Sequence, residues 1–205
     1  MDGRQHAIET RVEPLERFRG PDLHDLCDAA DAAIVDGGGF GWLAPPPRDV
    51  MENYWRGVLL IPERKLFVGR LDGAIAGSAQ LVLPTNNNEA GRMSGSLTTF
   101  FVAPWARGYG LALSLVQQVE AAAREADLKV LNLDVRETQR RAIQIYEQLG
   151  YHRWGTHPRY ALVDGRWMKG FYYHKDLVAD SPEADAPESD AQETDAAQAT
   201  QETTP

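Results

Sequence analysis

The sequence predicts one mixed α/β domain, and two observations lead to this fold class. The spacing of hydrophobic residues switches repeatedly between two and 3.6, which indicates strands and helices interleaved within one unit. The 205 residues, 43% of them hydrophobic and 25% charged, suit a domain that buries a full core. Internal repeats and interdomain linkers are absent from the sequence before residue 179. We therefore expect a folded domain over residues 1–178 and a tail over residues 179–205.

The first half of the domain is expected to contain three strands and two helices. Gly37-Gly38-Gly39 stops the first helix, and Asp72-Gly73 is a strong hairpin signal between two strands. The expected elements are a strand over Thr10–Phe18, helices over Pro21–Asp36 and Arg48–Leu60, and strands over 65–73 and 74–84. An aromatic and proline-rich loop, Phe40–Pro47, separates the two helices.

The second half is expected to contain strands and helices in alternation, followed by a hairpin. Gly150 suits the position after a helix, and Asp164-Gly165 predicts a second tight turn. The expected elements are a strand over Ser96–Val102, a helix over Leu111–Ala126, a strand over Lys129–Val135, a helix from about Thr138 to Gly150, and two strands on either side of Asp164-Gly165.

The net charge of −9 comes almost entirely from the tail. Residues 179–205 contain eight Asp or Glu and no Lys or Arg, so removing them leaves a charge of −1. A nearly neutral domain gives no reason to expect binding to nucleic acid or to an anionic membrane surface. The tail lacks aromatic residues and cannot bury enough surface to offset its ordering entropy. We expect it to be disordered, either as a solubilising appendage or as a partner-binding segment.

The cysteine content and hydropathy exclude several kinds of protein. Cys27 is the sole cysteine, so an intramolecular disulfide is impossible and a cysteine-based metal site is not expected. A cysteine within a helical pattern is typical of core packing. The sequence has no apolar run of 18 residues and no signal-peptide core at its start. A cytoplasmic protein without a metal is therefore expected.

A glycine-rich turn, ARGYGLA at residues 106–112, connects an apolar strand to an amphipathic helix. Gly108 and Gly110 let backbone N–H groups approach a ligand, and the helix start adds further free N–H groups. This arrangement favours a phosphate, although a simple tight turn explains it as well. A nucleoside-triphosphate loop is excluded because Gly110 is followed by Leu111-Ala112 instead of Lys-Ser/Thr. A dinucleotide site, with Asp134 on the ribose, remains open although Leu113 replaces the third glycine.

A third pattern fits residues 107–112 better. Arg-Gly-Tyr-Gly-Leu-Ala resembles the acyl-CoA pyrophosphate signature of the GNAT superfamily of N-acetyltransferases. The flanking TTFFVAPWARGYGLALSLV resembles that family's fourth strand and third helix, and LNLDVRETQRRAIQIYEQLGYHRWG resembles its fifth strand and following helix. The resemblance implies a mixed, mostly antiparallel sheet flanked by helices. It also implies a V-shaped split between the fourth and fifth strands.

The resemblance implies where acetyl-CoA, the acyl donor, would lie. Pyrophosphate would rest on the N–H groups of Arg107, Gly108, Tyr109, Gly110, Leu111 and Ala112. Pantetheine would pair with the preceding strand around Phe101 and Val102. Gln139 stands where many members carry a cofactor-binding Asn, and its amide can still donate and accept. Arg140 and Arg141 could reach the phosphates or form a solvated face.

Tyr146 is the expected catalytic residue. It shares a helix face with Ala142, Ile145 and Leu149, which by spacing alone is also the pattern of a core residue. The resemblance places its hydroxyl near the thioester sulfur, where it would protonate the leaving thiolate as a general acid. The backbone N–H of Val102 would hold the oxyanion. The base stays open between Asp134, His152, His157 and a water relay.

The acceptor is expected to be a primary amine, and the aromatic residues of the segments that form the acceptor side in this family suit a small amine. These residues are Phe40, Trp42, Trp55, Tyr160, Trp167, Tyr172 and Tyr173, which ordinary core packing would also explain. A protein lysine or N-terminus stays open, although the sequence outside the tail shows no acidic stretch that would recruit a basic peptide. Two other functions stay open: a non-catalytic acyl-CoA sensor of the same fold, and a dinucleotide-binding oxidoreductase. A homodimer is common in the superfamily.

Overall fold

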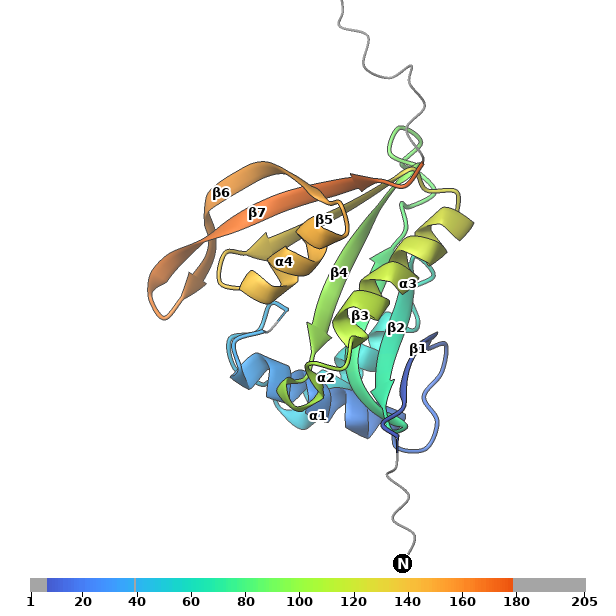
Figure 1. Cartoon of the computed structure of the whole chain (residues 1–205), viewed down its shortest axis with the longest axis vertical. Helices are drawn as coiled ribbons and strands as arrows, with labels where there is room; N and C mark the ends of the chain where they lie inside the picture. The colour runs from blue at the N-terminus through green and yellow to red at the C-terminus, as the bar shows by residue number, and fades with distance from the viewer. Residues whose placement is uncertain (1–6, 39, 179–205) are drawn as a thin grey trace, which may run out of the picture.

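Seven strands form one sheet in the order β1-β2-β3-β4-β5-β7-β6 (Figure 1). The computed structural model describes residues 7–38 and 40–178. The elements are β1 (Thr10–Pro14), α1 (Asp22–Val35), α2 (Arg48–Val58), β2 (Arg64–Leu71), β3 (Ala74–Val82), β4 (Ser94–Val102), the short 3₁₀ turn η1 (Pro104–Ala106), α3 (Leu111–Glu125), β5 (Val130–Arg136), α4 (Arg140–Gln148), β6 (His152–Val163) and β7 (Arg166–Asp176).

The sheet divides between β4 and β5. These two strands are parallel and pair only from Ser94 to Ser96 with Val130 to Asn132, whereas all other neighbours are antiparallel. The Asn132 side chain ties the start of the gap, because its Nδ2 donates to Ser94 Oγ at 2.7 Å. Beyond this point the two strands diverge (Figure 1). The mixed, mostly antiparallel sheet and its split are therefore confirmed.

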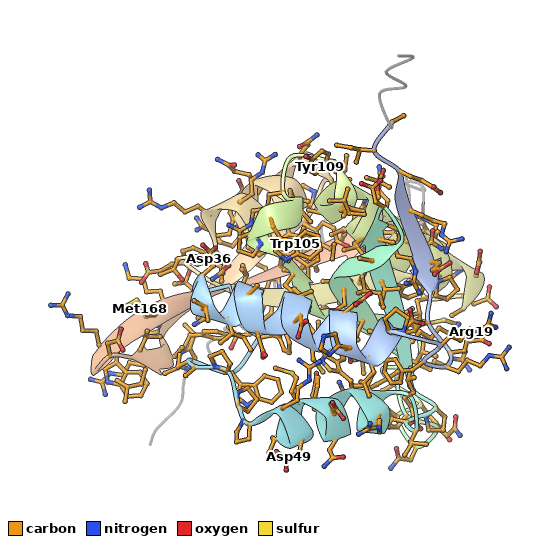
Figure 2. The ribbon with its side chains drawn as sticks, turned by 90° about the horizontal axis from the view of Figure 1, so that it is seen from below. Arg19, Asp36, Asp49, Trp105, Tyr109 and Met168 are labelled. Carbon is orange, nitrogen blue, oxygen red and sulfur yellow. The ribbon has the colours of Figure 1, made fainter. Side chains whose placement is uncertain are left out.

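Helices cover both faces of the sheet. Alternate residues of β2 divide between the two cores: Leu66 and Val68 pack with α1 and α2, and Phe67 packs with α3 on the other face. Figure 2 shows α1 and α2 lying side by side. Helix α4 joins the α3 side, where Ile145 and Tyr146 enter the same core as strands β5 and β7. The period-two and period-3.6 patterns in the sequence correspond to these faces.

Both Asp-Gly hairpin turns are confirmed. Asp72 and Gly73 have φ values of +48° and +87°, and Asp164 and Gly165 have φ values of +48° and +73°. A two-residue turn with both φ values positive matches the twist of antiparallel strands, which explains the preference for Asp-Gly. Gly150 likewise has a φ of +82° just after α4. The second turn places the long β6–β7 hairpin beside the site described below.

The structure corrects one predicted boundary substantially. The first strand was expected over Thr10–Phe18, but β1 ends at Pro14. Proline has no N–H to continue a ladder, so the chain leaves the sheet after one further bond, from Leu15 N–H to Leu66 O. Residues 15–21 then lead into α1, whose buried Asp22 is held by Arg70 at 2.9 Å. The expectation for the tail lies outside the described residues.

Candidate active site

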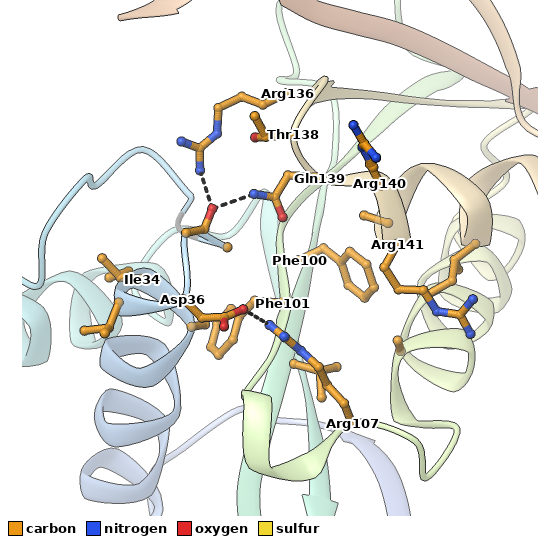
Figure 3. A pocket seen from close by; sticks show the side chains of 18 of the residues that line it. Ile34, Asp36, Phe100, Phe101, Arg107, Arg136, Thr138, Gln139, Arg140 and Arg141 are labelled. Carbon is orange, nitrogen blue, oxygen red and sulfur yellow. Dashed lines mark hydrogen bonds and ion pairs between the residues drawn. The ribbon is translucent and has the colours of Figure 1, made fainter. Parts of the chain in front are cut away.

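A cavity of about 1070 Å³ occupies the split in the sheet. Its walls are the end of α1, the open edge of β4, the glycine turn with the start of α3, the start of α4, and the β6–β7 turn. Segments far apart in the sequence therefore meet around one space (Figure 3). This volume lies at the upper end of the range that is usual for small-molecule and cofactor sites.

The glycine turn gives this cavity an anion-binding end. Gly108 and Gly110 have φ values of +89° and +81°, and an added Cβ at either would meet no other atom within 4 Å. Gly110 is the N-cap of α3, so the first N–H groups of that helix lack helical partners. The residues from Gly110 to Leu113 line the cavity. Free N–H groups and the positive end of a 15-residue helix favour a phosphate there.

Arg107 adds a cation to the same end of the cavity. One Nη of its guanidinium lies 2.6 Å from Oδ2 of Asp36, the residue that follows α1 (Figure 3). Both side chains are about half exposed, so the pair is accessible to solvent and to a ligand. The end of the cavity formed by the glycine turn and Arg107 therefore contains one carboxylate, that of Asp36, beside its cation.

The start of α4 is fastened to the end of α1 across the cavity. Gln139 Nε2 donates to Gly37 O at 2.6 Å, and an Arg136 Nη donates to the same oxygen at 3.4 Å (Figure 3). Gly37 can present this carbonyl because α1 ends in a left-handed turn, with a φ of +80° at Gly37. Arg140 and Arg141 also line the cavity. The opening is therefore rich in cations.

The edge of β4 forms another wall. Phe100, Phe101 and Val102 line the cavity, in the part of the strand that has no pairing with β5. Unpaired N–H and C=O groups on a strand edge can pair with an extended ligand as an added strand does. The cavity thus combines a site for an anion with a backbone edge for an amide-bearing chain.

A second cavity of about 490 Å³ adjoins the first, and both are lined by Phe100, Arg136, Gln139 and Ala142. Tyr146 lines this smaller cavity, with its ring packed 5.8 Å from that of Phe100. Burial first, and the negative charge of Asp134 second, raise the pKa of Tyr146 above its usual value. The hydroxyl therefore keeps its proton at neutral pH, as an ordinary tyrosine does, and the raised pKa makes it a weaker acid.

The far wall of the smaller cavity carries an acidic residue. Tyr160 of β6 donates a hydrogen bond to Asp134 Oδ2 of β5, and both line the cavity. Burial and this bond raise the pKa of Tyr160. His152 and His157, the other candidate bases, line neither cavity. Of the protein groups considered for the base, the geometry keeps Asp134.

The structure brings the predicted site residues together with one exception. The larger cavity is lined by Phe101, Val102, Arg107, Gly108, Gly110, Leu111, Ala112 and Gln139. Tyr109 does not line either cavity, and 43% of it is exposed. Among the aromatic residues expected on the acceptor side, Phe40 and Tyr160 line the smaller cavity, whereas Trp55 and Tyr173 are fully buried in the cores.

Several lining residues were not predicted from the sequence, among them Phe100 and Arg136, which line both cavities. Asp36 and Gly37 follow a helix, and Thr99 lies within a strand, so none of the three was expected at the site. A helix followed by Asp-Gly-Gly gives no local signal for a ligand. Asp36 and Gly37 meet partners 71 and 102 residues away in the sequence, Arg107 and Gln139 respectively.

Comparison with known proteins decides which family uses this arrangement. The sequence model of the acetyltransferase (GNAT) family matches residues 28–151, more than half of the chain. The chain belongs to this family. An uncharacterized N-acetyltransferase from the hisH-hisA intergenic region of Azospirillum brasilense is 63% identical over 133 residues, covering 65% of this chain and 79% of its own.

Solved structures share the GNAT fold. An N-acetyltransferase from Staphylococcus aureus superposes with a TM-score of 0.71 at 18% identity, over 83% of this chain and 99% of its own. A phosphinothricin acetyltransferase from Sinorhizobium meliloti, determined in complex with acetyl-CoA, gives a TM-score of 0.66 at 16% identity, over 82% of this chain and 88% of its own. At these identities the likeness concerns the fold.

Membership in the GNAT family makes this protein an acetyl-CoA-dependent acyltransferase. The residues present fit that donor: a backbone anion site at the glycine turn, cations around the opening, and a free strand edge. The dinucleotide alternative loses its basis, because a doubly wound domain needs a largely parallel sheet. Across residues 7–38 and 40–178, no cluster of three His, Cys, Asp or Glu side chains could hold a metal. None of the helices in that same part is long and apolar enough to cross a bilayer.

Proposed function

We propose that this GNAT acetyltransferase moves an acetyl group from acetyl-CoA to the primary amine of a small molecule by direct attack. The observation that carries the proposal is the junction of the two cavities at Phe100, with a phosphate-type site in one and a protonated tyrosine in the other. The donor would occupy the larger cavity and the amine the smaller one. The thioester would then lie where they meet.

The donor would be held by the backbone of two elements. Its pyrophosphate would accept hydrogen bonds from the N–H groups of residues 107–112, with Arg107 adding charge. Its pantetheine arm would pair with β4 at Phe101 and Val102, and Gln139 would close the opening from α4. Each of these contacts holds the donor in place without taking part in proton transfer.

The transfer itself needs two protons to be moved. The amine nitrogen attacks the thioester carbonyl carbon, forming a C–N bond, and the C–S bond then breaks. Tyr146 would give its hydroxyl proton to the leaving sulfur, which would otherwise depart as a thiolate. The proton released by the amine would pass to Asp134, directly or through water, and solvent would restore Tyr146.

The smaller cavity favours a small acceptor. Its volume of about 490 Å³ falls in the range of small-molecule sites, and its walls mix apolar rings with the Asp134 carboxylate. An ammonium group would be attracted to that carboxylate and would pass one proton through it to solvent before the attack, and an apolar body would pack against Phe40. A cytoplasmic location and a homodimer stay predictions from the sequence and the family resemblance.

The test is Tyr146→Phe. Loss of the proton donor should lower kcat with a responsive amine by about 10²- to 10⁴-fold, while the Kd for CoA stays nearly unchanged. The matched control is Tyr151→Phe, because Tyr151 is also buried and its ring lies 5.7 Å from Tyr146, yet it lines neither cavity. An equal loss in both variants, or no loss in Tyr146→Phe, contradicts the assignment. CoA binding without acetylation of any amine would favour the sensor function instead.

A further inference from the structure

Thr99 has an unusual backbone conformation in the middle of β4. Its φ is +51°, in the left-handed region that non-glycine residues enter only at an energetic cost. The register explains the irregularity: Phe101 lies opposite Ser78 and Thr98 lies opposite Gln80, so two residues of β4 face one of β3. Such a bulge re-aims side chains, and the one it re-aims here is a hydroxyl.

A chain of polar side chains ends at Thr99. Arg64 donates from Nη1 to Gln80 Oε1 at 2.9 Å, Gln80 Nε2 donates to the hydroxyl of Tyr54 at 3.3 Å, and that hydroxyl lies 3.3 Å from Thr99 Oγ1. The Ser78 hydroxyl holds the Thr99 carbonyl at 3.2 Å. Gln80 and Ser78 are fully buried, and Thr99 is 8% exposed. The left-handed conformation is thus held from two sides, by the buried Ser78 and by the half-buried Tyr54.

The partners of these side chains restrict the direction of each hydrogen bond between Arg64 and Thr99. A guanidinium only donates, so Gln80 accepts through its oxygen and must turn its NH₂ toward Tyr54. Tyr54 accepts that bond, and Thr99 Oγ1 is the acceptor that the described residues place within reach of its single hydroxyl hydrogen. The arrangement that uses every hydrogen therefore has Tyr54 donating to Thr99. Since Thr99 Oγ1 accepts from Tyr54, its own hydrogen is left to donate elsewhere. Thr99 lines the smaller cavity, so a ligand there can receive it.

The same direction excludes proton uptake along this chain. A base relay would have to carry the amine's proton from Thr99 toward Arg64, but each member already gives its hydrogen the other way. Arg64 cannot accept a proton at the end of it. What Thr99 offers the cavity is therefore a hydrogen-bond donor, while Asp134 on β5, with its carboxylate, offers an acceptor.

We propose that Thr99 is a specificity-determining residue that donates a hydrogen bond to an oxygen of the acceptor. The inference rests on the proposed function and narrows its substrate class to amines that also carry a hydrogen-bond-accepting oxygen, such as a carboxylate or an amide carbonyl. The amino group lies toward Asp134, and the oxygen lies toward β4.

The experiment compares matched acceptors with matched variants. Phenylalanine and phenylalaninamide carry an oxygen that 2-phenylethylamine lacks, and alanine and alaninamide form the same set with ethylamine. Thr99→Val keeps the shape and removes the hydroxyl, whereas Thr99→Ser keeps the hydroxyl. The ratio of variant to wild-type kcat/KM is taken for each acceptor, so differences in amine reactivity cancel.

The expected result is a loss confined to the oxygen-bearing members of each set. Thr99→Val should lower kcat/KM about 10- to 100-fold for the preferred oxygen-bearing amine and less than about 3-fold for the plain amine, as expected for a lost hydrogen bond. Thr99→Ser should restore most of the loss. An equal fall for both amines would show a merely structural role for Thr99 and overturn the proposal.

A second variant tests the row of hydrogen-bonded side chains without changing Thr99, the residue with the left-handed backbone. Tyr54→Phe leaves Thr99 in place but removes the donor that fixes the direction of its hydroxyl, so it should lower the oxygen-dependent preference by a smaller factor. This variant decides the matter if Thr99→Val no longer binds CoA. An unchanged preference in Tyr54→Phe would overturn the proposed polarity of the chain.

If the proposed acetyl transfer is wrong, the results differ from those expected when only the Thr99 site is wrong. In that case wild type binds CoA but acetylates none of the amines, and the same acceptors are titrated calorimetrically into CoA-loaded protein. Binding of the oxygen-bearing amines to wild type, with loss in Thr99→Val, supports the Thr99 site without turnover. Turnover by wild type with no preference between the members of any set overturns the Thr99 site alone.

Discussion

Arg107 has one anionic partner now and is proposed to take a second. Its guanidinium pairs with Asp36 at 2.6 Å at the opening of the larger cavity, where the donor's pyrophosphate would lie. Half-exposed ion pairs are worth about 0.2–1 kcal/mol, far less than a charge-assisted contact to a phosphate. We therefore expect the carboxylate to weaken donor binding, both by occupying Arg107 and by repelling the anion.

Asp36→Asn should tighten CoA binding. Removing the competing charge is expected to lower the Kd about 2- to 5-fold, the equivalent of one surface pair. Titration calorimetry with CoA measures this, and pantetheine, which lacks the pyrophosphate, should show no change. Asp49→Asn is the matched control, because Asp49 is an exposed carboxylate of α2 that lines neither cavity. Weaker binding in Asp36→Asn would mean that Asp36 positions Arg107 instead of competing for it.

Single residues differ sharply in how well the sequence predicts them. Gly108 and Gly110 were identifiable because a left-handed backbone beside a helix start selects glycine. Thr99 also has a positive φ, but it is not a glycine, so the sequence gives no sign of it; Ser78 and the register with β3 impose the conformation. Asp36 was equally hidden, because its partner is distant in sequence. Local backbone demands are visible in a sequence, and those imposed by tertiary contacts are not.

The β6–β7 hairpin delivers Tyr160 to the smaller cavity through close packing. The Tyr160 ring lies against the backbone of Gly170 on β7, so that an added Cβ at Gly170 would overlap the ring's first atoms. The hydroxyl then reaches Asp134 on β5. The register shift between His157 and Ala161 accommodates the ring. A glycine in the strand thus makes room for the ring that lines the smaller cavity.

Gly170→Ala should displace Tyr160 and disturb acceptor binding without affecting the donor. The expected loss is about 10- to 100-fold in kcat/KM, the range for a lost hydrogen bond to a charged group, with an unchanged Kd for CoA. Tyr160→Phe should reproduce most of it. Gly155→Ala in the same hairpin is the control, because its Cβ would lie at an ordinary 3.7 Å from Tyr172. If Gly170→Ala behaves like Gly155→Ala, Tyr160 does not hold the acceptor side together.

Secondary elements were predictable where their ends carry a chemical signal. Asp72-Gly73, Asp164-Gly165 and Gly150 each mark a boundary that the structure keeps. The start of α2 at Arg48, after three prolines, is kept as well. The end of β1 was wrong because apolar residues beyond Pro14, such as Leu15, continue the strand-like pattern while packing into the α1–α2 core. Burial alone does not show which element a residue belongs to.

The whole molecule is two half-sheets joined at one end. Strands β1–β4 and β5–β7 share three paired positions and the bond from Asn132 to Ser94, and one hydrophobic core runs beneath both halves, from Leu81 to Tyr173. The larger cavity takes its walls from both halves. A donor bound there would act as an added brace across the gap, since it contacts β4 and α3 on one side and α4 on the other.

Donor binding should therefore stabilise the protein as one unit. At about 100 times its Kd, CoA should add roughly 2.7 kcal/mol to the free energy of unfolding, which corresponds to a rise of about 5–10 °C in Tm for a chain of this size. Calorimetry should show a single transition with and without CoA, because the shared core couples the halves. NADH carries a pyrophosphate but no pantetheine arm to pair with β4, so its shift at equal concentration should be much smaller. Two transitions, of which CoA moves only one, would mean that the halves unfold separately and that the donor contacts one of them.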